Sequence, residues 1–128
     1  MNKPVQTEHA PAAMGPYSQA IEIDGWLFCS GQIGLEPGSG KLVVGGVEAE
    51  TRRVLENIRA ILFAAGLRLA DVITSTIFLV DLNDFEVVNR VYSEHFSAPY
   101  PARTTVQVAA LPRKARIEIA VVAHRLST

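Results

Sequence analysis

The chain has 128 residues, of which 48% are hydrophobic and 20% are charged, and its formal net charge is −1. This length suits a single domain over residues 1–128, and the composition lies outside the low-hydrophobicity, high-charge range of disordered proteins. Because 12 Lys and Arg balance 13 Asp and Glu, the chain offers no strong positive field, and neither a nucleic acid nor a membrane is an expected partner.

The only cysteine, Cys29, excludes an intrachain disulfide and any metal site built from several cysteines of one chain. No helix N-terminus or cation adjoins it in the sequence, so a buried, unreactive thiol is expected. The N-terminal residues contain no apolar stretch of signal-peptide length, and no segment approaches the ~20 apolar residues that span a bilayer. Together these features predict a cytoplasmic protein.

Turn-forming residues divide the first part of the chain into two short strands. An Ala/Pro/Gly loop over residues 10–16 precedes a predicted strand over 18–23. The Asp24-Gly25 pair is typical of a tight hairpin turn, and the β-prone residues 26–33 follow it. The sequence therefore predicts a β-hairpin near the start of the fold.

A helix and a central strand follow this hairpin. Apolar residues recur at helical spacing over 47–65 with charged residues on the other face, and Gly66 suits the left-handed position that ends a helix. Residues 72–80 are rich in β-branched side chains and become apolar on both faces, which is typical of a central strand.

The last part of the chain predicts a second helix and two more strands. Asn83 is a candidate N-cap with Glu86 as its capping-box partner, and an apolar stripe continues until Pro99. The two strands are expected over 103–108 and 116–124. The order ββαβαββ predicts an α+β fold, with one mixed β-sheet and two helices packed on one face. Because alternate strand residues are uncharged on both faces, we expect an oligomer to bury the other face.

Arg103 and Glu118 are the residues most suited to chemistry. Side chains alternate along a strand, so Arg103 shares a face with Thr105, while Glu118 lies in a strand whose other face is apolar. If these two strands pair as a hairpin, their polar faces coincide and Arg103 lies near Glu118. The guanidinium then suits a carboxylate and the glutamate accepts a proton from water, but a simple cross-strand ion pair explains the same pattern.

The sequence contains no pattern typical of a metal or nucleotide site. His9, His95 and His124 are scattered, without the spacing of metal ligands. The glycines between 31 and 40 match neither a dinucleotide-binding nor a phosphate-binding motif. We therefore expect no metal and no cofactor.

Five short motifs occur together, at residues 10–19 (APAAMGPYSQ), 30–33 (SGQI), 83–85 (NDF), 101–103 (PAR) and 117–119 (IEI). In this order and spacing they resemble the Rid/YjgF family of reactive-intermediate deaminases (RidA) over nearly the whole chain. The resemblance implies a chorismate-mutase-like fold that assembles as a homotrimer. It also implies that the ligand sites lie in clefts between subunits.

The resemblance further implies roles for individual residues. Arg103 is expected to bind the substrate carboxylate, and Glu118 is expected to hold or activate the attacking water. The other implied substrate-binding residues are Tyr17, Ser30, Gly31, Asn89 and Thr105. Many relatives have a second glutamate where this chain has Ala120. Some have cysteine where it has Thr105, and a threonine without an activating base argues against covalent chemistry there.

The implied activity is that of a 2-iminobutanoate/2-iminopropanoate deaminase, which hydrolyses reactive enamine and imine intermediates of amino-acid metabolism to 2-oxo acids and ammonia. The substrate is then a small 2-imino acid. A non-catalytic regulatory module that senses small 2-oxo acids in the same cleft is the alternative. The charge balance disfavours a nuclease or translation inhibitor, as reported for some relatives. The sequence does not identify the physiological imine, and it is also compatible with a specialised aminoacrylate or aminomuconate deaminase.

Overall fold

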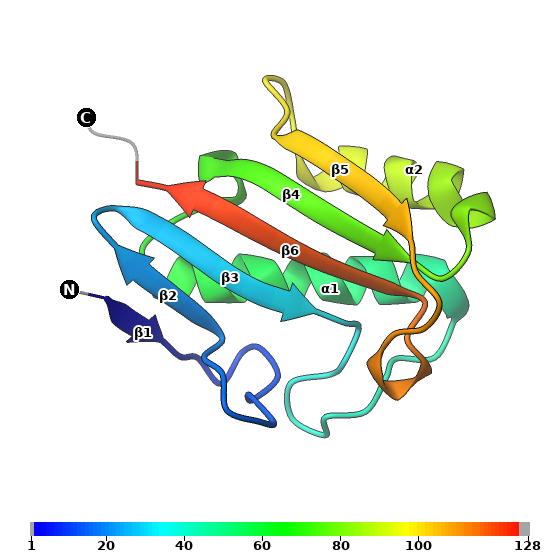
Figure 1. The fold of residues 1–128 in the computed structure, drawn as a ribbon, viewed down its shortest axis with the longest axis horizontal. Coiled ribbons are helices and arrows are strands. Elements are labelled where there is room, and N and C mark those ends of the chain that lie inside the picture. Colours follow the sequence, from blue (N-terminus) through cyan, green and yellow to red (C-terminus); the bar gives the residue numbers. More distant parts are fainter. Residues whose placement is uncertain (1, 126–128) are drawn as a thin grey trace.

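The computed structural model describes residues 2–125, which form one mixed sheet with two helices against one of its faces (Figure 1). The strands lie in the order β1-β2-β3-β6-β4-β5; β4 and β5 run parallel, and the other neighbours run antiparallel. The elements are β1 (Lys3–Val5), β2 (Ala20–Ile23), β3 (Trp26–Gln32), α1 (Gly46–Ala64), β4 (Val72–Leu79), α2 (Phe85–His95), β5 (Ala102–Gln107) and β6 (Ile117–His124). The expected α+β fold is confirmed.

Strand β1 is an addition to the predicted order. It pairs antiparallel with β2 at the edge of the sheet, and it contains Pro4, which suits an edge position. Of its three residues only Val5 is buried. A strand this short shows no alternation that a sequence pattern reveals.

The predicted hairpin is confirmed by β2 and β3, which pair Ile23 with Trp26 across the turn. Both turn residues have positive φ, 51° at Asp24 and 83° at Gly25. This backbone matches the twist of the two strands, and aspartate and glycine tolerate it better than most residues do. The local sequence therefore determines this turn.

The start of the second helix differs from the prediction. The Asp81 side chain accepts a hydrogen bond from the backbone N–H of Asn83 at 2.9 Å, within a short 3-10 turn over Leu82–Asp84. Helix α2 then begins at Phe85, and the Asn83 side chain does not cap it. The prediction was wrong because the carboxylate two residues upstream binds the local backbone donor first.

The predicted hairpin between the last two strands was also wrong. Strand β4 lies between β5 and β6, so that Ile77 pairs with Thr105 on one side and with Ile119 on the other. Strand β4 is the more apolar and takes the central position, whereas the more polar β5 lies at the sheet edge. The short, turn-prone segment between β5 and β6 suggested a hairpin, and nothing in its sequence indicated that β4 lies between these two strands.

The hydrophobic core fills the space between the helices and the sheet. Helix α1 contributes Leu55, Ile58, Ile61 and Leu62, each of them 0% exposed. From the sheet, Ile77, Leu79, Ile117 and Ile119 are equally buried and belong to the same cluster. Neither helix of the described residues is long and apolar enough to cross a membrane.

The opposite face of the sheet is also apolar. Trp26 and Phe28 of β3 are 40% and 49% exposed there, and Val106 of β5 is 39% exposed. In the described part of the chain, residues 2–125, no helix covers this face (Figure 1). Large aromatic and aliphatic side chains at such exposure are typical of an interface, so burial of this face in an oligomer stays a prediction.

Candidate functional site

A β-bulge in β3 forms the centre of the candidate site. Cys29 pairs with Val121 of β6 and Gln32 pairs with Ile119, so three steps along β3 match two along β6. Ser30 and Gly31 occupy the bulge. A bulge of this kind re-aims side chains and bends its strand, and here it turns the backbone of Gly31 toward β6.

Gly31 lies directly against the side chain of Glu118. A Cβ atom at residue 31 would overlap the Oε2 atom of the Glu118 carboxylate, so the close approach requires glycine. Glu118 pairs with Phe78 and therefore points to the face that the helices leave uncovered. It is partly buried, and loss of hydration raises its pKa above the ordinary value of 4.5.

Glu118 and Gly31 line a hollow of about 290 Å³ together with Tyr17, and we call it the Glu118 hollow. The N-terminal loop supplies its second wall through Pro11, Ala12 and Met14. The Tyr17 hydroxyl accepts a hydrogen bond from the backbone N–H of Met14 at 3.3 Å, which orients the ring within the loop.

Ser30 lies beside Gly31 in the bulge, but its hydroxyl is already engaged. It donates a hydrogen bond to the carbonyl oxygen of Ser18 at 2.6 Å. This bond ties the N-terminal loop to β3. The structure therefore places Tyr17, Ser30, Gly31 and Glu118 in one neighbourhood, with Ser30 serving to hold the loop.

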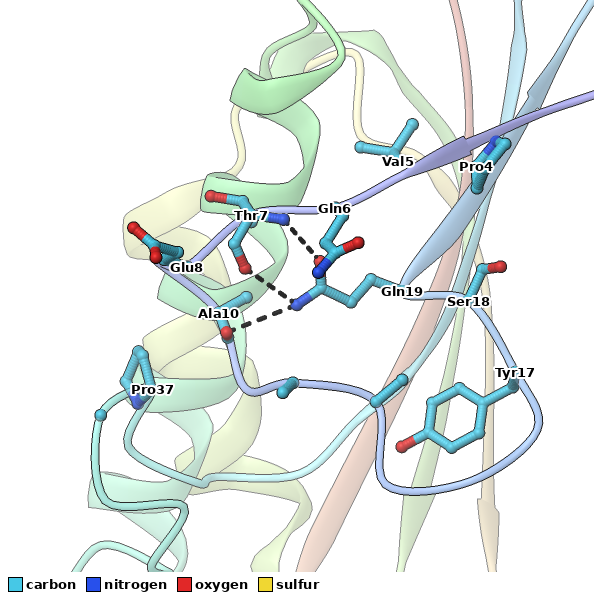
Figure 2. Close-up of a pocket in the computed structure, with 13 residues that line it drawn as sticks. Pro4, Val5, Gln6, Thr7, Glu8, Ala10, Tyr17, Ser18, Gln19 and Pro37 are labelled. Atoms are coloured by element: carbon cyan, nitrogen blue, oxygen red, sulfur yellow. Dashed lines mark hydrogen bonds between the residues drawn. The ribbon is translucent and has the colours of Figure 1, made fainter.

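Gln19 organises the N-terminal loop, and the chemistry of the sequence motifs did not single it out. Its side chain is 3% exposed, and its amide oxygen accepts a hydrogen bond from the Thr7 N–H at 2.8 Å. The amide nitrogen donates to the carbonyl oxygens of Thr7, Ala10 and Pro11 at 3.1, 3.4 and 2.8 Å. Figure 2 shows this amide reaching from the start of β2 into the loop. The amide thus fixes the wall of the Glu118 hollow.

Arg103 belongs to a separate group under helix α2. Its Nη2 atom donates a hydrogen bond to Oδ1 of Asn89 at 2.7 Å. The guanidinium carbon lies 5.4 Å from the ring centre of Phe85 and 5.0 Å from that of Tyr92. Contacts of this kind hold a guanidinium through cation–π attraction and leave its other N–H groups available.

Thr105 lies two residues further along the same face of β5, paired with the buried Ile77. Both Arg103 and Thr105 therefore belong to the helix-covered side of the sheet, at its edge. Asn89, one of the implied substrate-binding residues, is the hydrogen-bond partner of Arg103. The structure thus brings three predicted site residues together here.

The two groups of residues lie on opposite faces of the sheet. Arg103 pairs with Ser75, and Glu118 pairs with Phe78, and these two residues of β4 point to opposite sides. Within one chain, Arg103 and Glu118 do not meet, contrary to the expectation of coincident polar faces. The alternative of a cross-strand ion pair is wrong too, since the ion pairs of residues 2–125 include neither side chain.

Two further expectations concern reactive groups. Cys29 is buried, and desolvation raises its pKa to about 12, so the expected unreactive thiol is confirmed. Within the described range 2–125, no group of three or more His, Cys, Asp or Glu side chains is placed to hold a metal ion. The chemistry available at these sites is that of one guanidinium and one carboxylate.

The chain is similar to several named proteins. A family model described as Endoribonuclease L-PSP matches residues 7–125. The curated 2-iminobutanoate/2-iminopropanoate deaminase of Mus musculus is 48% identical over 123 residues, which cover 96% of this chain and 91% of the mouse protein.

Solved structures agree with this similarity. The crystal structure of RidA from an Antarctic Psychrobacter species matches with a TM-score of 0.93 and 44% identity, and the match covers 95% of this chain and 98% of that one. The structure of E. coli TdcF with bound serine matches with a TM-score of 0.91 and 42% identity, covering 97% and 99%. These matches confirm the expected chorismate-mutase-like fold.

Gly31→Ala should displace the Glu118 carboxylate. The added methyl group needs the volume that the carboxylate occupies, so we expect the Glu118 side chain to turn toward water and its pKa to fall toward 4.5. Rotation of this flexible side chain relieves the overlap, so we expect little change in the unfolding free energy. Carboxyl-carbon NMR titration and urea unfolding measure the two quantities. Gly38→Ala is the control because a Cβ there meets nothing within 4 Å; equal effects of the two substitutions on the Glu118 pKa would contradict the close approach.

Gln19→Ala should loosen the N-terminal loop. Loss of the amide leaves buried backbone groups of the loop without partners, and we expect about 3 kcal/mol less unfolding free energy. Amide hydrogen exchange over residues 7–17 should accelerate with it. Gln6→Ala is the matched control, since Gln6 is exposed. Unchanged exchange in the Gln19 variant would show that other contacts hold the loop.

Proposed function

Because this chain belongs to the endoribonuclease L-PSP family, which includes the reactive-intermediate deaminases, we propose that it is a 2-iminobutanoate/2-iminopropanoate deaminase. It hydrolyses small 2-imino acids to 2-oxo acids and ammonia. One observation carries the assignment: the chain contains both groups that this reaction uses. Arg103 is held in place by Asn89 and can bind a carboxylate, and Glu118 is a partly desolvated carboxylate beside an open hollow. The reaction requires no cofactor.

The complete site forms between subunits of a homotrimer. Arg103, Asn89 and Thr105 of one subunit face the Glu118 hollow of its neighbour. The separation of these residues by the sheet of each chain supports this assembly, because a substrate bridging both groups needs two copies. The exposed aromatic side chains of β3 support it as well, since an interface over this face removes them from water.

Arg103 fixes the carboxylate of the substrate. Asn89 and the two aromatic rings hold the guanidinium in place before the substrate arrives, so little side-chain freedom is lost on binding. A bidentate guanidinium–carboxylate pair then sets the orientation of the adjacent C=N carbon. Correct orientation is the main contribution that such a residue makes to the rate.

Glu118 orients the attacking water and takes its proton. The water oxygen bonds to the C=N carbon and the nitrogen retains the electron pair of the former π bond, which gives a carbinolamine. Proton transfer to nitrogen and loss of ammonia then leave the 2-oxo acid. A carboxylate whose pKa is raised by burial is a stronger base than one in water, and such assistance accounts for about 10²–10⁴-fold in rate.

The same residues favour catalysis over a non-catalytic sensor of 2-oxo acids. Arg103 serves either function, but a partly desolvated carboxylate beside an anionic ligand weakens binding unless it has a chemical role. The formal net charge of −1 disfavours an RNA substrate. Residues 1–128 act as one domain, and the cytoplasm is the proposed location, which the single buried cysteine supports.

Arg103→Ala and Glu118→Gln should each reduce catalysed imine hydrolysis by about 10²–10⁴-fold while the oligomer stays assembled. Each variant lacks a different half of the site. When the two variants are unfolded and refolded together in equal amounts, about a quarter of the wild-type activity should return, because random assembly of a ring pairs an intact Arg103 with an intact Glu118 at that frequency. The assay follows imine loss when an amino-acid oxidase generates the substrate.

The control mixture combines Arg103→Ala with the double variant Arg103→Ala, Glu118→Gln, which contains no intact Arg103 and should stay inactive. Native mass spectrometry confirms that subunits have mixed. Mixed but inactive trimers of the two single variants would refute the site between subunits, and full activity of Arg103→Ala would refute the role of that residue.

The pH dependence of kcat/KM should report Glu118. The carboxylate acts in its ionised form, so activity is present above its pKa and declines as the pH falls through it. Because burial raises this pKa, we expect the decline to begin above the ordinary value of 4.5. Rates between pH 4 and 8, corrected for uncatalysed hydrolysis, test this. The residual activity of Glu118→Gln should not decline in this pH range. If that variant shows the same decline at the same pH, the decline reports the titration of another group.

A further inference from the structure

The Glu118 hollow continues into a second hollow that the proposed reaction does not use. This second hollow measures about 280 Å³ and shares Pro11, Ala12, Met14, Leu35 and Arg113 with the first. It lies between the loop of residues 36–41 and the 3-10 turn Pro112–Lys114. We call it the basic annex, after Lys41 and Arg113. A ligand held at Glu118 therefore has room to extend toward two cationic side chains.

The annex itself is lined by positive charge. Among residues 2–125, its lining includes Lys41 and Arg113 and no carboxylate, while the Glu118 carboxylate lines the adjoining hollow. Neither Lys41 nor Arg113 takes part in an ion pair among residues 2–125. Two unpaired cations at one hollow attract an anion.

The backbone holds Arg113 in an unusual conformation at this place. Arg113 has φ 60° and ψ 21°, and Lys114 has φ 59°, so two successive non-glycine residues are left-handed. This conformation is unfavourable for residues with a Cβ atom, and it persists where surrounding contacts impose it, often at ligand clamps. Here Nη1 of Arg113 donates to the Gly40 carbonyl oxygen at 3.0 Å, which fixes the guanidinium at the rim of the annex.

We propose that the basic annex binds a second anionic group at the far end of the substrate side chain, so that the substrate class includes 2-imino acids with a side-chain carboxylate. The inference rests on the proposed function, because it places the reacting carbon at Glu118. The remaining N–H groups of Arg113 and the ammonium group of Lys41 recognise the distal carboxylate. Glutamate supplies an imine of this class, and glutamine supplies its uncharged counterpart.

The test compares the imines of glutamate and glutamine, which differ in the charge of the side chain. Wild-type protein should hydrolyse the glutamate imine with the higher kcat/KM. Arg113→Gln should lower the ratio of the two kcat/KM values about tenfold, the effect of losing one partly exposed charge-assisted hydrogen bond. Lys114→Gln is the matched control, because it removes a neighbouring charge from the same left-handed turn but lines neither hollow. It should leave the ratio unchanged.

A binding measurement separates this inference from the proposed function. By calorimetry, Arg113→Gln should weaken the affinity for 2-oxoglutarate about tenfold more than the affinity for 2-oxobutanoate. This outcome supports anion binding in the annex even if the protein hydrolyses no imine. Absence of imine hydrolysis would refute only the proposed deaminase activity. Equal effects on both 2-oxo acids, equal effects of the Arg113 and Lys114 variants, or a wild-type preference for the glutamine imine would each overturn the annex.

Discussion

The alternation of side chains across the sheet is the constraint on which the rest of this protein depends. Strand β4 lies between β5 and β6 and fixes the register of both, so that Arg103 and Glu118 point to opposite faces. One face is covered by the helices and the other is apolar and uncovered in the described residues 2–125. On the proposed mechanism, a reaction that uses both side chains needs two copies of the chain, and burial of the apolar face between those copies belongs to the same proposal.

Each half of the site is rigid for a different physical reason. Arg103 is held by an amide and by two aromatic rings of α2, which is itself anchored in the core. Glu118 is held by shape, because the bulge brings the backbone of Gly31 against its carboxylate and the amide of Gln19 fixes the loop opposite. Burial raises the pKa of Glu118, which links the packing of the bulge to the proton transfer that we propose for this residue.

Sequence patterns failed where a competing group decided the outcome. Asn83 has the chemistry of an N-cap, but the nearby Asp81 carboxylate binds its backbone first. The last two strands have the spacing of a hairpin, but β4 separates them. Gln19 is an ordinary polar residue in sequence, and its four contacts become visible only when the loop folds back over it. In the last two cases the partner is set by packing, which no local pattern contains.

The sequence by itself determined the elements with strong local signals: the Asp24-Gly25 hairpin, helix α1 ending before Gly66, and β4 as the central strand. It also identified the family through its motifs, and with it the residues of the candidate site. Only the tertiary structure decided how those residues are divided between the two faces and which of them touch. Strand order and bulges depend on long-range pairing, and a shift of one residue moves a side chain to the other face of the sheet.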